Sequence, residues 1–534
     1  MNTKSFFLLL VIAVTSLTAV CQSNDVVFRD KMTSAVMKVY DEHLAQNPND
    51  YNILFARAHQ NYYNGDYTAA LADVNQALVL TPKTDKELRF DEYILRARIS
   101  DARRDYTSEL ADLRLAQELE PKSLPCTDLI AKASLKAGDL ATAEKSFKTI
   151  LRAESMNYDA MYGLAQVEQA RGNTKAAISQ ASKAVELFRV EPQVYVNRAD
   201  IYSRQGNIEA AVQDLLMGMA VGDGGNAAQR LFDLSDTNYD GVMRSLDDIA
   251  NRGGEVGGMY RYLRANIALD HCHYAQALND LNYIKNLNLY DSPAVYHNMA
   301  KCLLELGRYD EAVVNADKAL ADDPTQPEFY LVKSQAEYYA GEDGNFDAAM
   351  EWLNRCSLMA PQYVPMLLGK AALYVRQGND KEALGYLNAA LANESGNAEA
   401  LLSRALVLKR MGYDKLALAN LNTMLLLSDD VYDLKGFALN ELGRDSEAFN
   451  WLRQITTTPV SGGENYYYAA LFMAQRGDNF KAKEYLEKAI ELGYGSRHNL
   501  LREELFPVSL QSLRGESGYD LIVDKAQRNF VGGN

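Results

Sequence analysis

The chain has 534 residues and a formal net charge of −16 at pH 7, and 48% of its residues are hydrophobic. This hydrophobic content argues against intrinsic disorder, and 12 prolines and 33 glycines are few for a multi-stranded protein with many turns, so a helical fold is favoured. The negative charge makes nucleic acid a poor partner, because phosphate binding depends on clustered lysine and arginine.

The first segment, residues 1–23, has the layout of an export signal. Lys4 supplies a positive charge, and the apolar run FFLLLVIAV from Phe6 to Val14 is too short to span a bilayer. The small residues that follow are typical of the cleavage region of a secretory signal peptide. We therefore expect the chain to be exported.

Cys21 can be interpreted in two ways. Cleavage after Cys21 would place Ala19 and Cys21 at the two small-residue positions that the signal protease needs. Alternatively, LTAVC resembles a bacterial lipobox, which would make Cys21 a lipid-bearing N-terminus. Val20 and Thr18 depart from that pattern, where glycine or alanine and leucine are usual. The sequence leaves both interpretations open.

A 34-residue pattern runs through most of the chain. YTAALADVNQALVLTP at 67–82 returns at 106–121 as YTSELADLRLAQELEP. A small residue in a second helix marks each copy, and six successive steps between the markers are 34 residues. The markers are Ala70, Ala143, Ala177, Ala211, Ala277, Ala312, Ala349, Ala383, Ala417, Ala448 and Ala482, with Glu109 in that place once. Most copies have another small residue twelve positions earlier, which lets the paired helices approach closely.

This pattern resembles the tetratricopeptide repeat, a helix-turn-helix unit with small residues at its eighth and twentieth places and a terminal proline. Ala300, Ala312 and Pro324 occupy those places in one copy. The resemblance covers about residues 50–492, with about 12 to 13 repeats. Together with the export signal at residues 1–23, it indicates an exported protein of the bacterial type. It implies an all-α fold, a right-handed α-solenoid whose hairpins bury their apolar faces against one another.

The period also divides the chain into segments. The step from Ala211 to Ala277 is 66 residues, which predicts a divergent repeat between them, with two helices broken near Asp240 and Gly241. After residue 492 the period stops, and capping helices are expected. The predicted segments are a signal peptide at 1–23, an N-terminal helix at 24–49, a first array at 50–225, the divergent repeat at 226–256, a second array at 257–492, and capping helices with a tail at 493–534.

Five residues in the divergent repeat match a calcium loop. Asp236, Asn238, Asp240, Gly241 and Asp247 occupy places 1, 3, 5, 6 and 12 of such a loop. Against this interpretation, place 12 is usually a glutamate that binds with both oxygens. A helix cap followed by a glycine turn explains the same residues.

Other signs of chemistry are weak. His271, Cys272 and His273 replace a glycine-containing turn, but adjacent residues cannot easily all reach one zinc ion, even with His297 one repeat away. The chain has no GxSxG, GxxxxGK[ST] or HExxH motif, so we predict neither an enzyme nor a cofactor. The cysteines beyond Cys21 never form a CxxC pair, which argues against a disulfide framework.

The resemblance implies that a concave groove is lined from the second, fifth, ninth, twelfth and thirteenth places of each first helix. Aromatic residues at these places could anchor a peptide or helix, since large rings dominate binding hot spots. The alternative is that they pack between helices. The rings are Phe55, Tyr62, Tyr63, Tyr162, Tyr262, Tyr338, Tyr339 and Tyr467.

The same register places Arg98, Lys132 and Lys136 side by side in the groove. This basic strip could receive an acidic segment, or it could be paired with Asp101 and Asp128.

Taken together, the sequence predicts a non-enzymatic scaffold that binds partner proteins or peptides, in the periplasm or at the outer membrane. The alternative is a glycan or peptide receptor component of an outer-membrane uptake system.

Overall fold

The structure is a computed structural model of the chain. The residues that it describes are 36–222, 226–251, 254–286, 292–341, 344–427, 434–457, 462–501 and 509–531. Every regular element in these ranges is a helix, which confirms the prediction of an all-α repeat solenoid. The predicted signal peptide at 1–23, with Cys21, lies outside the described residues.

The chain divides into two compact units. The N-terminal unit is Asp25–Leu231, and the C-terminal unit comprises Phe232–Asn534. The division falls within helix α13 (Ala227–Ala250), whose backbone is non-helical at Asn238. This kink lies two residues before Asp240, where the sequence predicts the break of the divergent repeat.

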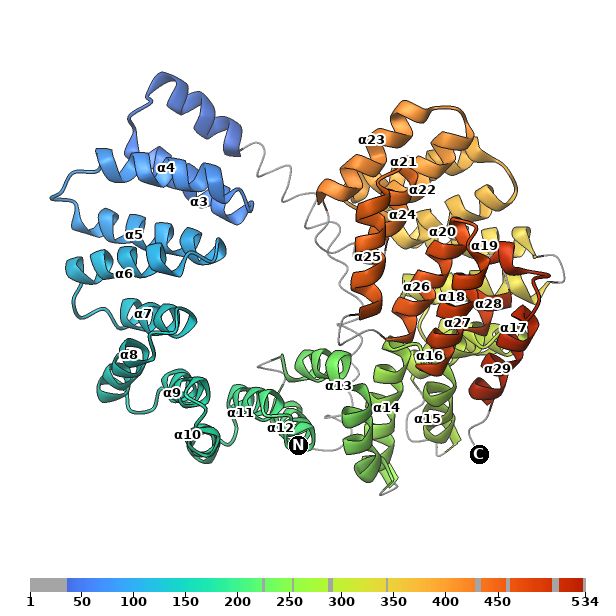
Figure 1. The fold of residues 1–534 in the computed structure, drawn as a ribbon, viewed down its shortest axis with the longest axis horizontal. Coiled ribbons are helices and arrows are strands. Elements are labelled where there is room, and N and C mark those ends of the chain that lie inside the picture. The colour runs from blue at the N-terminus through green and yellow to red at the C-terminus, as the bar shows by residue number, and fades with distance from the viewer. Residues whose placement is uncertain are drawn as a thin grey trace. The chain divides into compact units, whose positions relative to one another are not determined.

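The N-terminal unit is a row of helical hairpins, in which each helix packs against its neighbours in sequence (Figure 1). Residues 36–46, inside the predicted N-terminal helix, are helical. The labelled helices are α3 (Tyr51–Tyr63), α4 (Tyr67–Leu80), α5 (Lys86–Ala102), α6 (Tyr106–Leu119), α7 (Leu124–Lys136), α8 (Leu140–Ala153), α9 (Tyr158–Ala170), α10 (Thr174–Leu187), α11 (Pro192–Arg204) and α12 (Ile208–Val221).

The C-terminal unit continues the same arrangement of paired helices. Its first hairpins are α14 (Gly254–Asp270), α15 (Tyr274–Asn286), α16 (Pro293–Glu305), α17 (Tyr309–Asp322), α18 (Pro327–Ala340), α19 (Phe346–Met359), α20 (Val364–Arg376) and α21 (Asp380–Asn393). The later elements are α22 (Ala398–Arg410), α23 (Asp414–Leu427), α24 (Lys435–Glu441), α25 (Asp445–Thr457), α26 (Gly463–Gln475), α27 (Asn479–Glu491), α28 (Arg497–Leu501), the short helix η2 (Gln511–Leu513) and α29 (Tyr519–Val531).

The turn inside each hairpin has a recurring backbone conformation. Gly65 has a φ of 79°, which glycine adopts without strain, and the neighbouring Asp66 side chain accepts a hydrogen bond from the Ala69 amide. Arg104 and Cys272 stand in the glycine's place in two other copies, with φ of 59° and 60°. The hairpin therefore keeps this conformation even where the residue is not glycine, and Cys272 belongs to a turn as expected.

Small residues set the spacing between helices. Ala58 and Ala70, at the two small-residue places of the first repeat, are fully buried. Gly163 of α9 lies so close to Phe147 of α8 that an added Cβ would be 2.3 Å from the ring. Large side chains of one helix thus fill the space that small residues leave on the next.

A buried ion pair recurs at a fixed position, and we call it the hairpin clamp. Arg198 of α11 donates two hydrogen bonds, each of 2.7 Å, to the buried carboxylate of Asp214 in α12. Arg198 also donates to the Ser182 hydroxyl in the preceding hairpin at 3.1 Å. The same separation of 16 residues recurs in Arg57–Asp73, Arg96–Asp112, Arg264–Asp280 and, with an amide as acceptor, Arg404–Asn420.

Two repeats of the C-terminal unit use an aromatic ring at the acceptor position of the clamp. Lys333 and Lys370 are buried, and their ammonium nitrogens lie 5.3 Å and 5.5 Å from the ring centroids of Trp352 and Tyr386. The face of an aromatic ring attracts a cation. Lys333 is also paired with Asp317 at 2.7 Å and Glu337 at 2.9 Å, whereas burial lowers the pKa of Lys370.

Residues after the last repeat fold back onto earlier helices of the C-terminal unit. We call residues 493–500 the closing segment. The Ser496 hydroxyl donates a hydrogen bond to the Glu305 carboxylate of α16. The His498 ring packs edge-on against Tyr339 of α18, with the centroids 4.4 Å apart. The region predicted to cap the solenoid therefore also contacts helices far back in the array.

Candidate partner-binding groove

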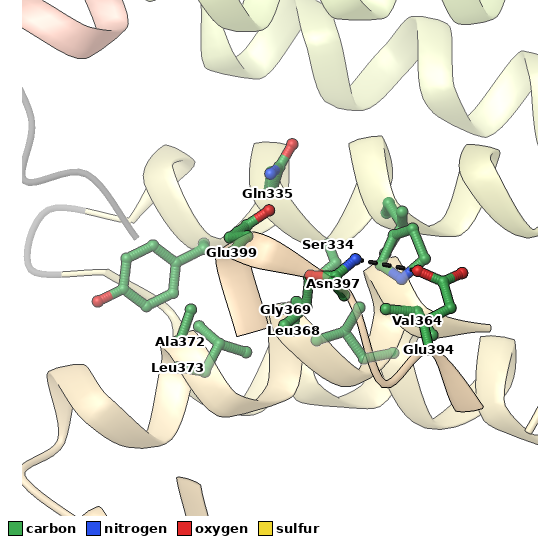
Figure 2. A pocket seen from close by; sticks show the side chains of 14 residues that line it. Ser334, Gln335, Val364, Leu368, Gly369, Ala372, Leu373, Glu394, Asn397 and Glu399 are labelled. Carbon is green, nitrogen blue, oxygen red and sulfur yellow. Dashed lines mark hydrogen bonds between the residues drawn. The ribbon is translucent and has the colours of Figure 1, made fainter. Parts of the chain in front are cut away.

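A groove with a volume of about 350 Å³ crosses α18, α20 and the start of α22 (Figure 2). Leu331 of α18 and Leu368 and Ala372 of α20 line it, and all three are half-buried. Tyr338 of α18, a residue predicted to line the concave face, is also part of the lining. The groove therefore offers apolar surface that the described residues leave uncovered.

The polar end of the groove is held by a helix cap. The Asn397 side-chain oxygen accepts a hydrogen bond of 2.9 Å from the Ala400 amide at the start of α22. The amide nitrogen of the same side chain donates to the Glu394 carboxylate at 3.0 Å. Figure 2 shows Glu394 and Asn397 towards one end of the groove and Ala372 towards the other.

A smaller hollow of about 30 Å³ continues the groove along α20 and α22. It shares Leu368 and Glu399 with the main groove and adds Val375 and Leu406. Arg410 at its edge is bound to Asp380, with a nitrogen–oxygen distance of 2.5 Å. The two hollows together form a trough with a mostly apolar floor.

Glu399 lines both hollows and carries a carboxyl group with a raised pKa. Its side chain is exposed to the groove, yet the surrounding walls raise the pKa of its carboxyl above the ordinary value. Burial causes that shift, and no cation among the residues that the structure describes opposes it. The Arg376 guanidinium, a cation near the groove, lies against the ring of Tyr338, 5.4 Å from its centroid.

Residues 129–192, 163–218 and 297–356 match a family model described as the tetratricopeptide repeat. These segments are similar to tetratricopeptide repeats. The last matched segment includes α18, so part of the groove is built from such a repeat. A comparison with curated proteins gives no match.

Several solved tetratricopeptide repeat proteins are similar to parts of the chain. One from Thermus thermophilus is 24% identical over 35% of this chain and 98% of its own, with a TM-score of 0.32. One from Parabacteroides merdae is 15% identical over 60% of this chain and 98% of its own, with a TM-score of 0.28. The C-terminal part of one from Cytophaga hutchinsonii is 16% identical over 49% of this chain and 93% of its own, with a TM-score of 0.32.

Three of the predicted groove rings are buried. Tyr262, Tyr339 and Tyr467 have almost no exposed surface, because the chain's own residues cover them. Tyr467 is stacked on Tyr494 of the closing segment, with centroids 4.5 Å apart, and Tyr339 contacts His498. The expectation that these three rings line an open surface is wrong, and the alternative of packing within the fold holds. A glycan could not stack on the buried faces of these three tyrosine rings.

The predicted rings of the N-terminal unit differ in exposure. Phe55 and Tyr62 are half-buried and pack against the core of the first repeat. The half-buried Tyr162 donates a hydrogen bond of 2.6 Å to Asp200. Tyr63 remains 67% exposed. Within this unit, Tyr63 is therefore the predicted ring with the most surface available to a partner.

The predicted basic strip is mostly neutralised by ion pairs. Lys132 lies 2.6 Å from the Asp128 carboxylate, and Lys136 lies 2.5 Å from that of Asp101. These are the two pairings that the alternative interpretation predicted, and they are confirmed. Arg98 is exposed and contributes to lowering the pKa of a nearby histidine, after the larger effect of burial.

The calcium candidate is not a loop. Residues 236–247 belong to α13, and within that helix the backbone is non-helical at Asn238. Asp247 instead accepts a hydrogen bond from the Arg264 clamp. The helical backbone on both sides of the kink differs from the twelve-residue calcium loop that the spacing of Asp236, Asn238, Asp240 and Asp247 resembles.

Among the described residues, one group of three has ligand atoms close enough to share a metal ion. These are Asp236, Asp270 and His271, whose atoms lie within 4.8 Å of one another. Burial and the repulsion from Asp270 raise the pKa of Asp236 to about 6. The His271 ring is also hydrogen bonded to the Ser235 hydroxyl at 2.9 Å. Three ligands fall short of a complete zinc or calcium site, so we assign no metal here.

The sequence prediction of groove residues missed Leu331, Leu368, Ala372 and Glu399. It selected aromatic residues, although these four stand at the fifth, ninth and second places that the family register assigns to the concave face. Leucine at the fifth place of two successive copies was the signal that could have identified the trough.

Two further observations concern the environment of the chain. Cys126, Cys272, Cys302 and Cys356 are free and buried, as the absence of paired spacing predicted. Burial raises the pKa of the Cys126 thiol to about 11, which keeps it protonated and unreactive.

Among the described helices, none combines the length and the hydropathy needed to span a bilayer.

Proposed function

We propose that this protein is a non-enzymatic scaffold that holds a segment of a partner protein in the trough of α18, α20 and α22. The carrying observation is the trough itself, which is open, mostly apolar and edged by a few polar groups, as binding sites commonly are. The tetratricopeptide repeat is a fold consistent with a protein-interaction scaffold.

We also propose that the protein is of the exported bacterial type, with about 12 to 13 repeats, and acts in the periplasm or at the outer membrane. The charged start, short apolar run and small residues of segment 1–23 support this location. Intact-mass spectrometry of the protein from its host tests it. A mass that lacks the segment supports export, an added lipid mass on Cys21 identifies an anchored form, and an unprocessed mass contradicts the proposal.

A photocrosslinking amino acid in place of Gln335 tests the binding role, because Gln335 lines the groove and is exposed. We expect irradiation of host cells to give a discrete adduct with a partner protein. The matched control carries the same amino acid in place of Asn422, an exposed residue on the second helix α23. No adduct from position 335, or the same adducts from both positions, would contradict the proposal.

A further inference from the structure

The charges in the trough indicate which charge a bound segment should carry. This inference rests on the proposed function. Two other charged groups of the trough already have a partner, which is a carboxylate in one case and a neutral amide in the other. Arg410 holds Asp380 at 2.5 Å, and the Asn397 amide holds Glu394 at 3.0 Å. Glu399 lines both hollows and has no ion pair with another described residue.

An uncompensated carboxylate in an apolar trough restricts what can cover it. A purely apolar segment would take the Glu399 carboxylate further from water without replacing its hydration, which is unfavourable. An acidic segment would add repulsion to the same loss. A segment that carries a cation gives the carboxylate a partner, while its apolar side chains cover Leu331, Leu368 and Ala372.

We propose that the trough binds a segment of a partner protein in which apolar side chains flank one lysine or arginine, and that this cation pairs with Glu399. The half-buried leucines contribute affinity by excluding water. Glu399 contributes selectivity for the charge of the segment.

Fluorescence anisotropy with three labelled peptides tests the charge preference. The probes are a short blocked peptide of leucine and alanine with one central lysine, and the same peptide with norleucine or glutamate in place of the lysine. We expect the lysine peptide to bind the full chain most tightly. Glu399→Gln should weaken its binding by about tenfold or more and leave the norleucine peptide unchanged. Glu399→Lys should shift the preference to the glutamate peptide.

The matched control is Glu487→Gln, which removes the same charge from an exposed residue of α27. If Glu399→Gln and Glu487→Gln weaken the lysine peptide equally, the effect is one of overall charge and the proposed pairing is overturned. Equal binding of the lysine and norleucine peptides overturns it as well.

A third variant, Ala372→Trp, separates this inference from the proposed function. The indole would fill the trough, so all peptide binding should be lost, while circular dichroism and the melting temperature check that the variant folds. If Ala372→Trp abolishes binding but Glu399→Gln does not weaken it, the trough remains the binding site and only the charge pairing fails. If Ala372→Trp leaves all peptide binding intact, the trough is not the site and both proposals fail.

Discussion

Glu109 shows how one residue can work against the repeat in which it stands. It occupies the second-helix place where eleven other copies have alanine, and it is buried at 6% exposure. Burial first, and then repulsion from Asp101, raise the pKa of its carboxyl to about 7. One carboxylate oxygen has no hydrogen-bond partner among the described residues. An ionised Glu109 is therefore a cost to the fold near neutral pH.

We expect Glu109→Ala to stabilise the protein, and more so at pH 8 than at pH 5. The folded pKa of about 7 is above the ordinary glutamate value of 4.5, so the native state binds the proton more tightly and loses stability as pH rises between these values. Removing the carboxyl should raise the free energy of unfolding at pH 8 by about 1–3 kcal/mol. Urea denaturation at both pH values measures it.

Glu118→Ala is the control for this prediction, because Glu118 is an exposed glutamate of the same helix. It should change stability little at either pH. A Glu109→Ala gain that is the same at pH 5 and pH 8 would show that packing, and not the buried charge, accounts for the effect.

At the scale of helices, the hairpin clamp joins three elements at once. Arg198 links α11 to Asp214 of α12 and to Ser182 of α10. Burial raises the pKa of Asp214, while the hydrogen bond from Arg198 opposes that shift and favours the ionised form. The arginine is therefore needed mainly to prevent an unpaired buried charge.

We expect Arg198→Ala to lower the free energy of unfolding by about 3–5 kcal/mol, because it leaves the Asp214 carboxylate buried and unpaired. The double variant Arg198→Met with Asp214→Leu should recover most of this loss. Arg171→Ala, which removes an exposed arginine paired with Glu144, should have a much smaller effect. Thermal and urea denaturation measure all three, and a double variant as unstable as the single one would contradict this account.

The helices and their order could be predicted from the sequence because each repeat contacts mainly its neighbours. The spacing of Ala58 and Ala70 therefore carried enough information to place a hairpin. The hairpin clamp is visible in the sequence as an arginine sixteen residues before an aspartate. This spacing predicts an ion pair only once both residues are known to lie in one hairpin. The exposure of the rings could not be predicted, because it depends on distant parts of the chain.

At the scale of the whole molecule, the closing segment connects residues that are remote in sequence. Ser496 and Glu305 are 191 residues apart, and His498 and Tyr309 are 189 apart with a hydrogen-bonding distance of 3.1 Å. The Gly495 amide also donates to the Cys272 carbonyl oxygen at 2.9 Å. A repeat pattern records only local contacts, so the end of the period at residue 492 gave no sign of where the segment packs.

We expect Tyr494→Ala to loosen the C-terminal unit alone. Tyr494 is buried and stacked on Tyr467, so truncation leaves a cavity and releases the closing segment. Hydrogen–deuterium exchange should become faster in α16, α18 and α26, while α3 to α12 keep their rates.

The control is Tyr413→Ala, which removes the same side chain from an exposed position of the C-terminal unit. It should leave exchange in α16 and α18 unchanged. Faster exchange in both units of the Tyr494→Ala variant would show that the closing segment stabilises more than the unit in which it packs.

The reach of the closing segment has a consequence for the order in which the protein matures on the ribosome. Hairpins α3 to α12 rely on contacts between neighbours, so they can form one after another as they emerge. Tyr339 and Glu305 must wait until Ser496 and His498 have been synthesised. During that interval the surfaces of Tyr339 and Glu305 that the closing segment later covers remain exposed. The incompletely synthesised chain is therefore vulnerable to aggregation and to binding by chaperones.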